Sequence, residues 1–207
     1  MRMACTIAAM LGFAAVPAAA VDTYQCRFED EQDGTHAILE QHYFGPDAPI
    51  LPARQRVWAE AGGIHFGADS GPIRPLRDEP FELPVEISLG IELPARPATR
   101  QVTLNAPGVA PIRLRGHVWP SSTQTPGAIF YVRGRDRISA LFRIRDWTAL
   151  FRDSDGGVQF VVPFSMPANL ETMRALHDRQ RLRMREAARD PVRNCTHLLE
   201  DTIEEII

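Results

Sequence analysis

The sequence of 207 residues contains no lysine, so all 23 of its Lys/Arg positions are arginines. It has no internal repeat and no composition typical of a linker. After residue 20 it has no apolar stretch long enough to cross a bilayer, which takes about 20 residues. These absences exclude a repeat architecture and predict no transmembrane segment in the mature chain. They favour a single domain formed by residues 21–207.

The first 20 residues have the pattern of a secretory signal peptide. Arg2 is followed by an apolar run from about Ile7 to Val16 and by small residues that end at Ala20. A structural helix here would need a polar face, which this segment lacks. The sequence therefore predicts cleavage after Ala20 and a periplasmic or secreted mature protein that begins at Val21.

Cysteine is scarce, with three residues in the whole chain, and Cys5 lies in the predicted signal peptide. Cys26 and Cys195 then remain, one near each end of the mature chain. In an oxidising compartment this pair predicts a disulfide, with two separately buried thiols as the alternative. A bridge that closes a loop of about 170 residues would stabilise the fold by roughly 5 kcal/mol in the chain-entropy model.

The charges of the chain are segregated. Residues 21–94 carry 5 arginines against 14 acidic residues, whereas residues 95–189 carry 16 arginines against 7 acidic residues. This separation is expected either in a protein that attracts an anionic partner to its basic part or in one whose two halves attract each other.

The clearest structural signal lies between Pro84 and Pro94. Five apolar residues alternate there with polar ones, which predicts a strand with one buried face formed by Val85, Ile87, Leu89, Ile91 and Leu93. Similar alternation predicts further strands over 23–29, 35–44, 101–104, 112–118, 128–132, 138–144 and 158–164. Residues 45–80 are rich in proline and glycine, and we expect mostly irregular structure there, with two short strands over Gln55–Ala59 and Ile64–Phe66 joined by a turn at Gly62-Gly63.

Helices are expected mainly at the C-terminal end. Asp146 would cap one or two helical turns that carry Trp147, Leu150 and Phe151. A longer helix is predicted over about 168–189, and a last helix after Asp190-Pro191 would place Cys195 on its buried stripe. The expected fold is thus mainly β with C-terminal α: an antiparallel β-sandwich or barrel-like core over about 21–164, followed by two C-terminal helices within about 165–207.

Residues Gly67–Pro72, read as G-A-D-S-G-P, resemble the nucleophile segment of trypsin-like serine proteases. In that family the nucleophile comes late in the chain, whereas Ser70 comes early and follows no matching histidine motif, so a turn serine is the favoured interpretation. An enzyme would be favoured if a pocket united two or three of the following residues: His36, His42, His65, Asp69 and Ser70.

Metal-ligating residue types occur, but their spacing is unconvincing. His36, Glu40 and His42 share one strand face without matching a zinc pattern. Asp153-x-Asp155-Gly156 and Asp30-x-x-Asp33-Gly34 lack the distal Glu of a calcium loop and are interpreted as turns. We therefore expect no metal and no cofactor.

The arginines of the basic part give the leading functional hypothesis. On strands, Arg113 and Arg115 would share a face, as would Arg143 and Arg145, and Trp119 and Tyr131 lie nearby in the sequence. Guanidinium groups bind carboxylate and phosphate bidentately. The expected function is a non-catalytic envelope protein that binds an anionic ligand or acidic partner, but not nucleic acid. The alternatives are an enzyme acting on envelope material and a structural subunit of an envelope complex.

Overall fold

The computed structural model describes residues 22–45, 48–49, 53–73, 80–118 and 126–198. Its twelve strands form one sheet, and all neighbouring strands run antiparallel in the order β11-β10-β7-β8-β9-β6-β5-β4-β2-β1-β12, with β3 paired to β2. The strands are β1 (Thr23–Gln32), β2 (Thr35–Phe44), β3 (Ala48–Pro49), β4 (Ala53–Ala61), β5 (Ile64–Ile73), β6 (Glu86–Glu92), β7 (Gln101–Asn105), β8 (Ile112–Val118), β9 (Gly127–Arg133), β10 (Trp147–Arg152), β11 (Val158–Phe164) and β12 (Thr196–Leu198).

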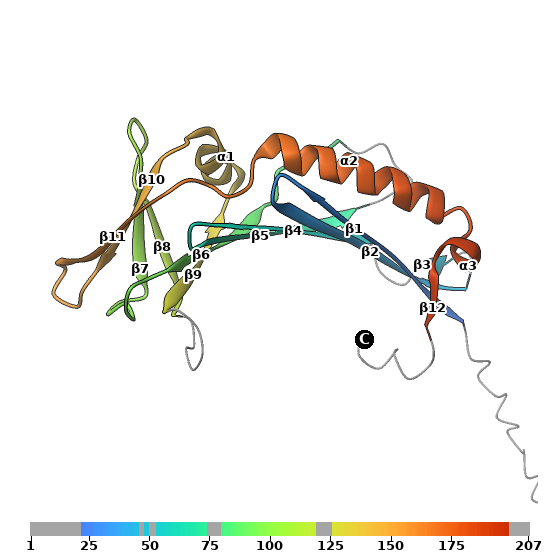
Figure 1. Ribbon diagram of the computed structural model, residues 1–207, viewed down its shortest axis with the longest axis horizontal. Helices are drawn as coiled ribbons and strands as arrows, with labels where there is room; N and C mark the ends of the chain where they lie inside the picture. The colour runs from blue at the N-terminus through green and yellow to red at the C-terminus, as the bar shows by residue number, and fades with distance from the viewer. Residues whose placement is uncertain (1–21, 46–47, 50–52, 74–79, 119–125, 199–207) are drawn as a thin grey trace, which may run out of the picture.

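Two helices cover one face of this sheet. In Figure 1, α2 (Leu170–Ala187) lies along β1 and β2, and α1 (Arg135–Arg143) lies near β6 and β9 on the same side. The short α3 (Pro191–Asn194) follows α2 and leads into β12. We call the face under α1 and α2 the covered face. The opposite one is the open face, because none of the described helices packs on it.

Glycine-containing turns join the regular hairpins at the N-terminal end. Asp33 and Gly34 have φ values of 51° and 70° between β1 and β2, and Gly62 and Gly63 have φ values of 58° and 73° between β4 and β5. Two consecutive residues with positive φ form the turn whose twist suits a tight hairpin, which is why glycine is favoured there. Both turns were expected from the sequence.

The two short strands predicted over Gln55–Ala59 and Ile64–Phe66 are present, but the expectation of mostly irregular structure over 45–80 is wrong for most of the described residues. β4 and β5 are regular strands of 9 and 10 residues. Their inward positions on β4 include Ala53, Gln55 and Ala59 beside Val57, so small and polar residues obscure the apolar alternation. The two strands nevertheless pair along their length, because the hydrogen bonds between them join backbone N–H and C=O groups and do not require large apolar side chains.

Two neighbouring predictions between 135 and 152 are exchanged in the structure. Residues 138–144 were predicted as a strand but lie mostly in α1, whereas the segment after Asp146 was predicted as helical but forms β10. The sequence fits both periods, because Trp147 has an apolar partner two residues on in Ala149 and four residues on in Phe151. Burial decides the outcome, since Trp147, Ala149 and Phe151 are all buried on one side of β10.

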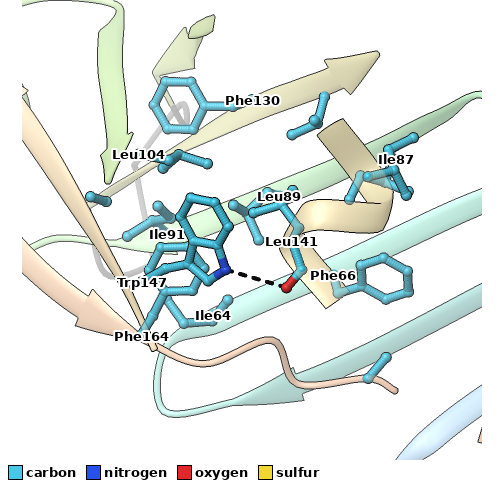
Figure 2. Close-up of a cluster of buried hydrophobic side chains, with 14 of the residues drawn as sticks. Ile64, Phe66, Ile87, Leu89, Ile91, Leu104, Phe130, Leu141, Trp147 and Phe164 are labelled. Atoms are coloured by element: carbon cyan, nitrogen blue, oxygen red, sulfur yellow. Dashed lines mark hydrogen bonds between the residues drawn. The ribbon is translucent and has the colours of Figure 1, made fainter. Parts of the chain in front are cut away.

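The main core lies between the sheet and α1 (Figure 2), and the first turns of α2 add Met173 and Leu176 to it. Leu89 and Ile91 of β6 are fully buried, and Trp147 packs among them with its indole N–H donating to the carbonyl oxygens of Leu141 and Ile144 at 3.3 and 3.1 Å. Four of the five apolar residues predicted on this strand are buried. Val85 is the exception: it precedes β6 and is 65% exposed.

A second and smaller core lies between α2 and the first strands. Met184 and Ala187 of α2 pack there with Tyr24 and Leu39, next to the disulfide between Cys26 and Cys195. The predicted disulfide is therefore confirmed, with a Cα–Cα distance of 4.6 Å.

Beside this small core, α2 meets the sheet through buried polar groups. The Gln180 side-chain amide donates to the carbonyl oxygens of Phe28 and Ala37, at 3.1 and 2.7 Å, and its oxygen accepts from Gln55 at 2.8 Å. The Gln55 oxygen lies 3.1 Å from Nδ1 of His177. Because hydrogen bonds need a particular direction between donor and acceptor, these contacts fix where α2 lies along the sheet, which apolar burial alone would do less precisely.

The helix ends correct the sequence interpretation in detail. α2 begins after Asn169, whose Oδ1 accepts from the Thr172 N–H at 2.7 Å, and not at Ala168. The last helix is only α3, because Cys195 is extended and β12 follows it directly. The remaining predicted positions of that helix, residues 199–207, lie outside the described residues, as does the predicted signal peptide.

The predicted fold class is confirmed: a mainly antiparallel β structure with helices toward the C-terminal end, in which the sheet is not closed into a barrel. Among the described residues, no helix combines the length and apolarity needed to span a membrane.

Candidate functional site

The open face brings together side chains from distant segments of the chain. On each strand, the residues between the buried ones point to this face, because successive side chains alternate sides. Arg113 and Arg115 flank the buried Leu114 on β8, so both guanidinium groups lie on the open face and are exposed. The predicted shared face of these two arginines is therefore present.

Arg113 and Arg115 border a shallow depression of about 680 Å³ that spans β10, β7 and β8. Thr103 and Gln101 of β7 lie directly opposite Arg113 and Arg115 in the ladder. Arg152 of β10 lines the same depression and adds a third guanidinium group. We call the surface around Arg113, Arg115 and Arg152 the arginine depression; its combination of guanidinium and neutral polar groups suits an anion.

The other predicted members of this cluster do not join it. Arg143 is the last residue of α1, which packs on the covered face, and its Nε donates to the carbonyl oxygen of Ser139 one turn earlier. Arg145 lies in the connection to β10, and Trp119 lies outside the described residues. The predicted group of four arginines on paired strands is wrong, because it assumed that 138–144 formed a strand.

The acidic N-terminal half pairs with several arginines, but not with those of the depression. Arg183 of α2 lies 3.0 Å from Asp30 of β1, and Arg133 of β9 pairs with Glu86 of β6. By contrast, no carboxylate in the described part of the chain forms an ion pair with any arginine of the depression. The positive charges of Arg113, Arg115 and Arg152 therefore lie near one another, and none of the described carboxylates pairs with them.

The histidines predicted as catalytic candidates lie against separate carboxylates. His36 is 3.6 Å from Glu31 and His42 is 2.6 Å from Glu40, at different positions along the N-terminal hairpin. Burial raises the pKa of the Glu40 carboxyl. Hydrogen bonds from His42 and Gln25, with the charges of His42 and Arg27, together lower it by more, so the pKa lies below its usual value. An ionised carboxylate of this kind is a weak general base.

His65 lies between two carboxylates on neighbouring strands. Its Nδ1 is 3.2 Å from Glu60 of β4, and its Nε2 is 3.4 Å from Glu92 of β6. The three ligand atoms are close enough to hold a metal ion. However, the two carboxylates face opposite ring nitrogens, whereas an ion can bind only one nitrogen of a given imidazole. The imidazole of His65 therefore lies between the two neighbouring strands, with a hydrogen bond to Glu92 and an ion-pair contact with Glu60.

Asp69 and Ser70 complete the set of catalytic candidates. Both belong to β5, so Ser70 lies in a strand opposite Gln55 and not in the turn expected from the sequence. The Ser70 side chain is outside the described part. Among the described candidates, each histidine contacts its own carboxylates and Asp69 lies opposite Arg56, so these side chains do not form the pocket that an enzyme would need.

Two features of the open face escaped the sequence interpretation: the place of Arg152 and the proximity of Trp58 to Tyr131. Arg152 was placed after a helix, so its strand position beside β7 was not foreseen. Trp58 and Tyr131 come from β4 and β9, and both are exposed on the open face. Alternation on each strand indicates that these rings point outward, but only the strand order and register bring them near one another.

Comparison of the chain with protein-family models, with curated proteins and with solved structures finds no match. The function is therefore inferred from the chemistry of the open face.

Proposed function

We propose that this protein is a non-catalytic, exported envelope protein that binds an anionic ligand through the arginine depression. The observation that carries the proposal is the exposure of Arg113 and Arg115 on one strand face, without an ion-pair partner among the described carboxylates. Export is supported by the pattern of residues 1–20 and by the disulfide, a bond typical of oxidising compartments.

The geometry of the depression favours an extended anion over a compact one. It is shallow and spans three strands, and its guanidinium groups stand on β8 and β10 with the neutral side chains of β7 between them. β-strands hold the backbone positions of these arginines on a rigid frame, so the spacing of the charged groups along and across the strands is set before a ligand binds. An acidic polymer that lies across the strands would satisfy several of these groups at once.

Binding to anionic probes at low and high salt tests this proposal. Polyphosphate, polyglutamate and vesicles that contain an anionic lipid are titrated against the full chain, with Arg113→Ala/Arg115→Ala alongside. Exposed charges are screened beyond a Debye length of about 8 Å at physiological ionic strength, so binding should weaken as salt rises and should be lost in the double variant.

Arg179→Ala/Arg183→Ala is the matched control, because it removes the same charge from α2, where both arginines contact Asp30. This control should retain binding. The proposal is overturned if no probe binds at low salt, or if both double variants weaken binding equally. A large fall in melting temperature in Arg113→Ala/Arg115→Ala alone would instead mean that these arginines act as an internal clamp.

A further inference from the structure

A row of four residues crosses the middle of the open face in register. Trp58 of β4 lies opposite Gly67 of β5, Gly67 opposite Ser88 of β6, and Ser88 opposite Tyr131 of β9. Neighbouring strands are about 4.8 Å apart, so three such steps separate the two ring-bearing residues by roughly 14 Å. Two large aromatic side chains thus stand at the ends of a row whose centre carries the smallest ones.

The centre of the row is low because Gly67 has no side chain. A Cβ atom at Gly67 would lie 2.5 Å from Oγ of Ser88, closer than any real contact, and this hydroxyl donates to the Gly67 carbonyl oxygen at 3.2 Å. The result is a trough of about 440 Å³ lined by Trp58 and Tyr131. These rings are 40% and 43% exposed, so a ligand in the trough can reach them.

Each ring is supported by a neighbouring imidazole. His36 stacks on Trp58 with ring centroids 5.3 Å apart and an angle of 12° between the planes. His117 meets Tyr131 edge to face, with centroids 6.4 Å apart and an angle of 73°. Both aromatic side chains are therefore held in place before any ligand arrives, which lowers the entropic cost of binding.

The charges around the trough are balanced. Arg56 and Asp69 lie opposite each other on β4 and β5 and line it on one side. Glu86 also lines it and pairs with Arg133. An uncharged ligand is favoured here because an anion would meet the two carboxylates. A purely apolar ligand would leave these polar groups without partners.

We propose that the trough between Trp58 and Tyr131 binds an uncharged saccharide chain. A sugar ring has faces made of C–H groups, which pack on aromatic rings, and a rim of hydroxyl groups, which need hydrogen-bonding partners. Trp58 and Tyr131 supply the first kind of contact, and Ser88, Asp69 and Arg56 supply the second. This inference goes beyond the anion-binding proposal and does not rest on it.

The test uses two neutral, β-linked hexasaccharides, cellohexaose and chitohexaose, titrated into the full chain by calorimetry. At least one should bind, and Trp58→Ala and Tyr131→Ala should each weaken that binding about tenfold or more, which corresponds to about 1.4 kcal/mol. Ser88→Leu keeps both rings but fills the trough, so it should weaken binding as much. Circular dichroism and melting confirm that each variant is folded.

Three controls locate the effect. Tyr131→Phe retains the ring, and Leu182→Ala removes an exposed apolar side chain from α2, so both should bind within about twofold of the wild type. Arg113→Ala/Arg115→Ala should bind the saccharide normally, which separates this inference from the anion-binding proposal. Failure of both saccharides to bind, or unchanged binding in folded Trp58→Ala and Ser88→Leu, would overturn it.

Discussion

The two long helices cover the same face of one sheet but are attached to it by different interactions. α1 places Ile138 and Leu141, both fully buried, into the main apolar core. α2 also places Met173 and Leu176 in that core, but further along it rests on a hydrogen-bonded group formed by Gln55, His177 and Gln180, next to a small core and a disulfide. Where the sheet offers fewer large apolar side chains, directional bonds and a covalent link replace them.

This difference has an energetic side. Apolar burial stabilises a helix without fixing its register, whereas a buried amide must find its partners or lose the free energy of its hydration. Gln180 finds two backbone carbonyl groups and one side chain. We call α2 with the strands beneath it, β1, β2 and β4, the α2 half. The position of its helix should be fixed more precisely than that of α1, and its stability should fall more when a single hydrogen bond is lost.

Removing the disulfide should have the largest effect. The bridge joins residues 169 positions apart, and the chain-entropy model gives about 5 kcal/mol for a loop of this length. Cys26→Ser/Cys195→Ser should lose free energy of unfolding of that order in denaturant titrations. Amide hydrogen exchange should rise first in α2 and β12, with β6 and β9 retaining their protection longest. Uniform loss of protection in both halves would show that they do not differ in the way described.

A substitution in the main core should come next. Leu89 of β6 is fully buried, so Leu89→Ala should lower the free energy of unfolding by about 2–5 kcal/mol through lost burial and the cavity left behind. Its neighbour Ser88 points to the open face, and Ser88→Ala removes only a hydroxyl and its bond to the Gly67 carbonyl oxygen, so it should lower stability by about 1 kcal/mol or less. Equal effects of the two substitutions in thermal or chemical unfolding would contradict the assignment of the two faces.

The smallest expected effect is a pH dependence of the free energy of unfolding that arises from His177 in the α2 half. Burial lowers the pKa of His177 below its ordinary value of 6.5, with Asp178 raising it less and Arg181 lowering it slightly. The unfolded chain then binds more protons than the folded one just below this pH. The contribution of the neutral His177 to stability is therefore fully present above about pH 6.5. It decreases as the pH falls from the pKa of His177 in the unfolded chain through its lower pKa in the folded protein.

His177→Gln should remove this slope from a series of denaturant titrations, whereas His36→Gln, a substitution on the open face, should keep it. Glu40 acts in a lower window: its pKa is depressed from 4.5, so its contribution is present above that pH and is lost on further acidification. A slope that begins below about pH 6.5 and persists in His177→Gln would refute the assignment.

Much of the fold follows from local signals in the sequence. Hairpin turns at Asp33-Gly34 and Gly62-Gly63 need residues that accept positive φ, and the strand over Ile87–Leu93 alternates cleanly. The cysteine pair was identifiable because only two remained after the predicted signal peptide. These predictions succeed because each depends on a few adjacent residues or on a count.

The failures have a common physical origin. Over 135–152 the apolar residues fit both a period of two and a helical period, so only packing against β6 and β9 decides which segment becomes α1. The error carried over to the site, because it placed Arg143 and Arg145 on a strand. Similarly, the row from Trp58 to Tyr131 depends on a register across four strands, which no local pattern contains.

An open sheet has two edges, and this protein protects them in different ways. At one edge, β11 carries Pro163, which has no N–H to offer to an added strand. At the other, β12 pairs with Thr23–Gln25 of β1 and follows directly after Cys195. Reduction of the disulfide should loosen β12, and the backbone groups of Thr23–Gln25 would then be open to a strand of a second molecule. The covalent link thus acts against self-association as well as against unfolding.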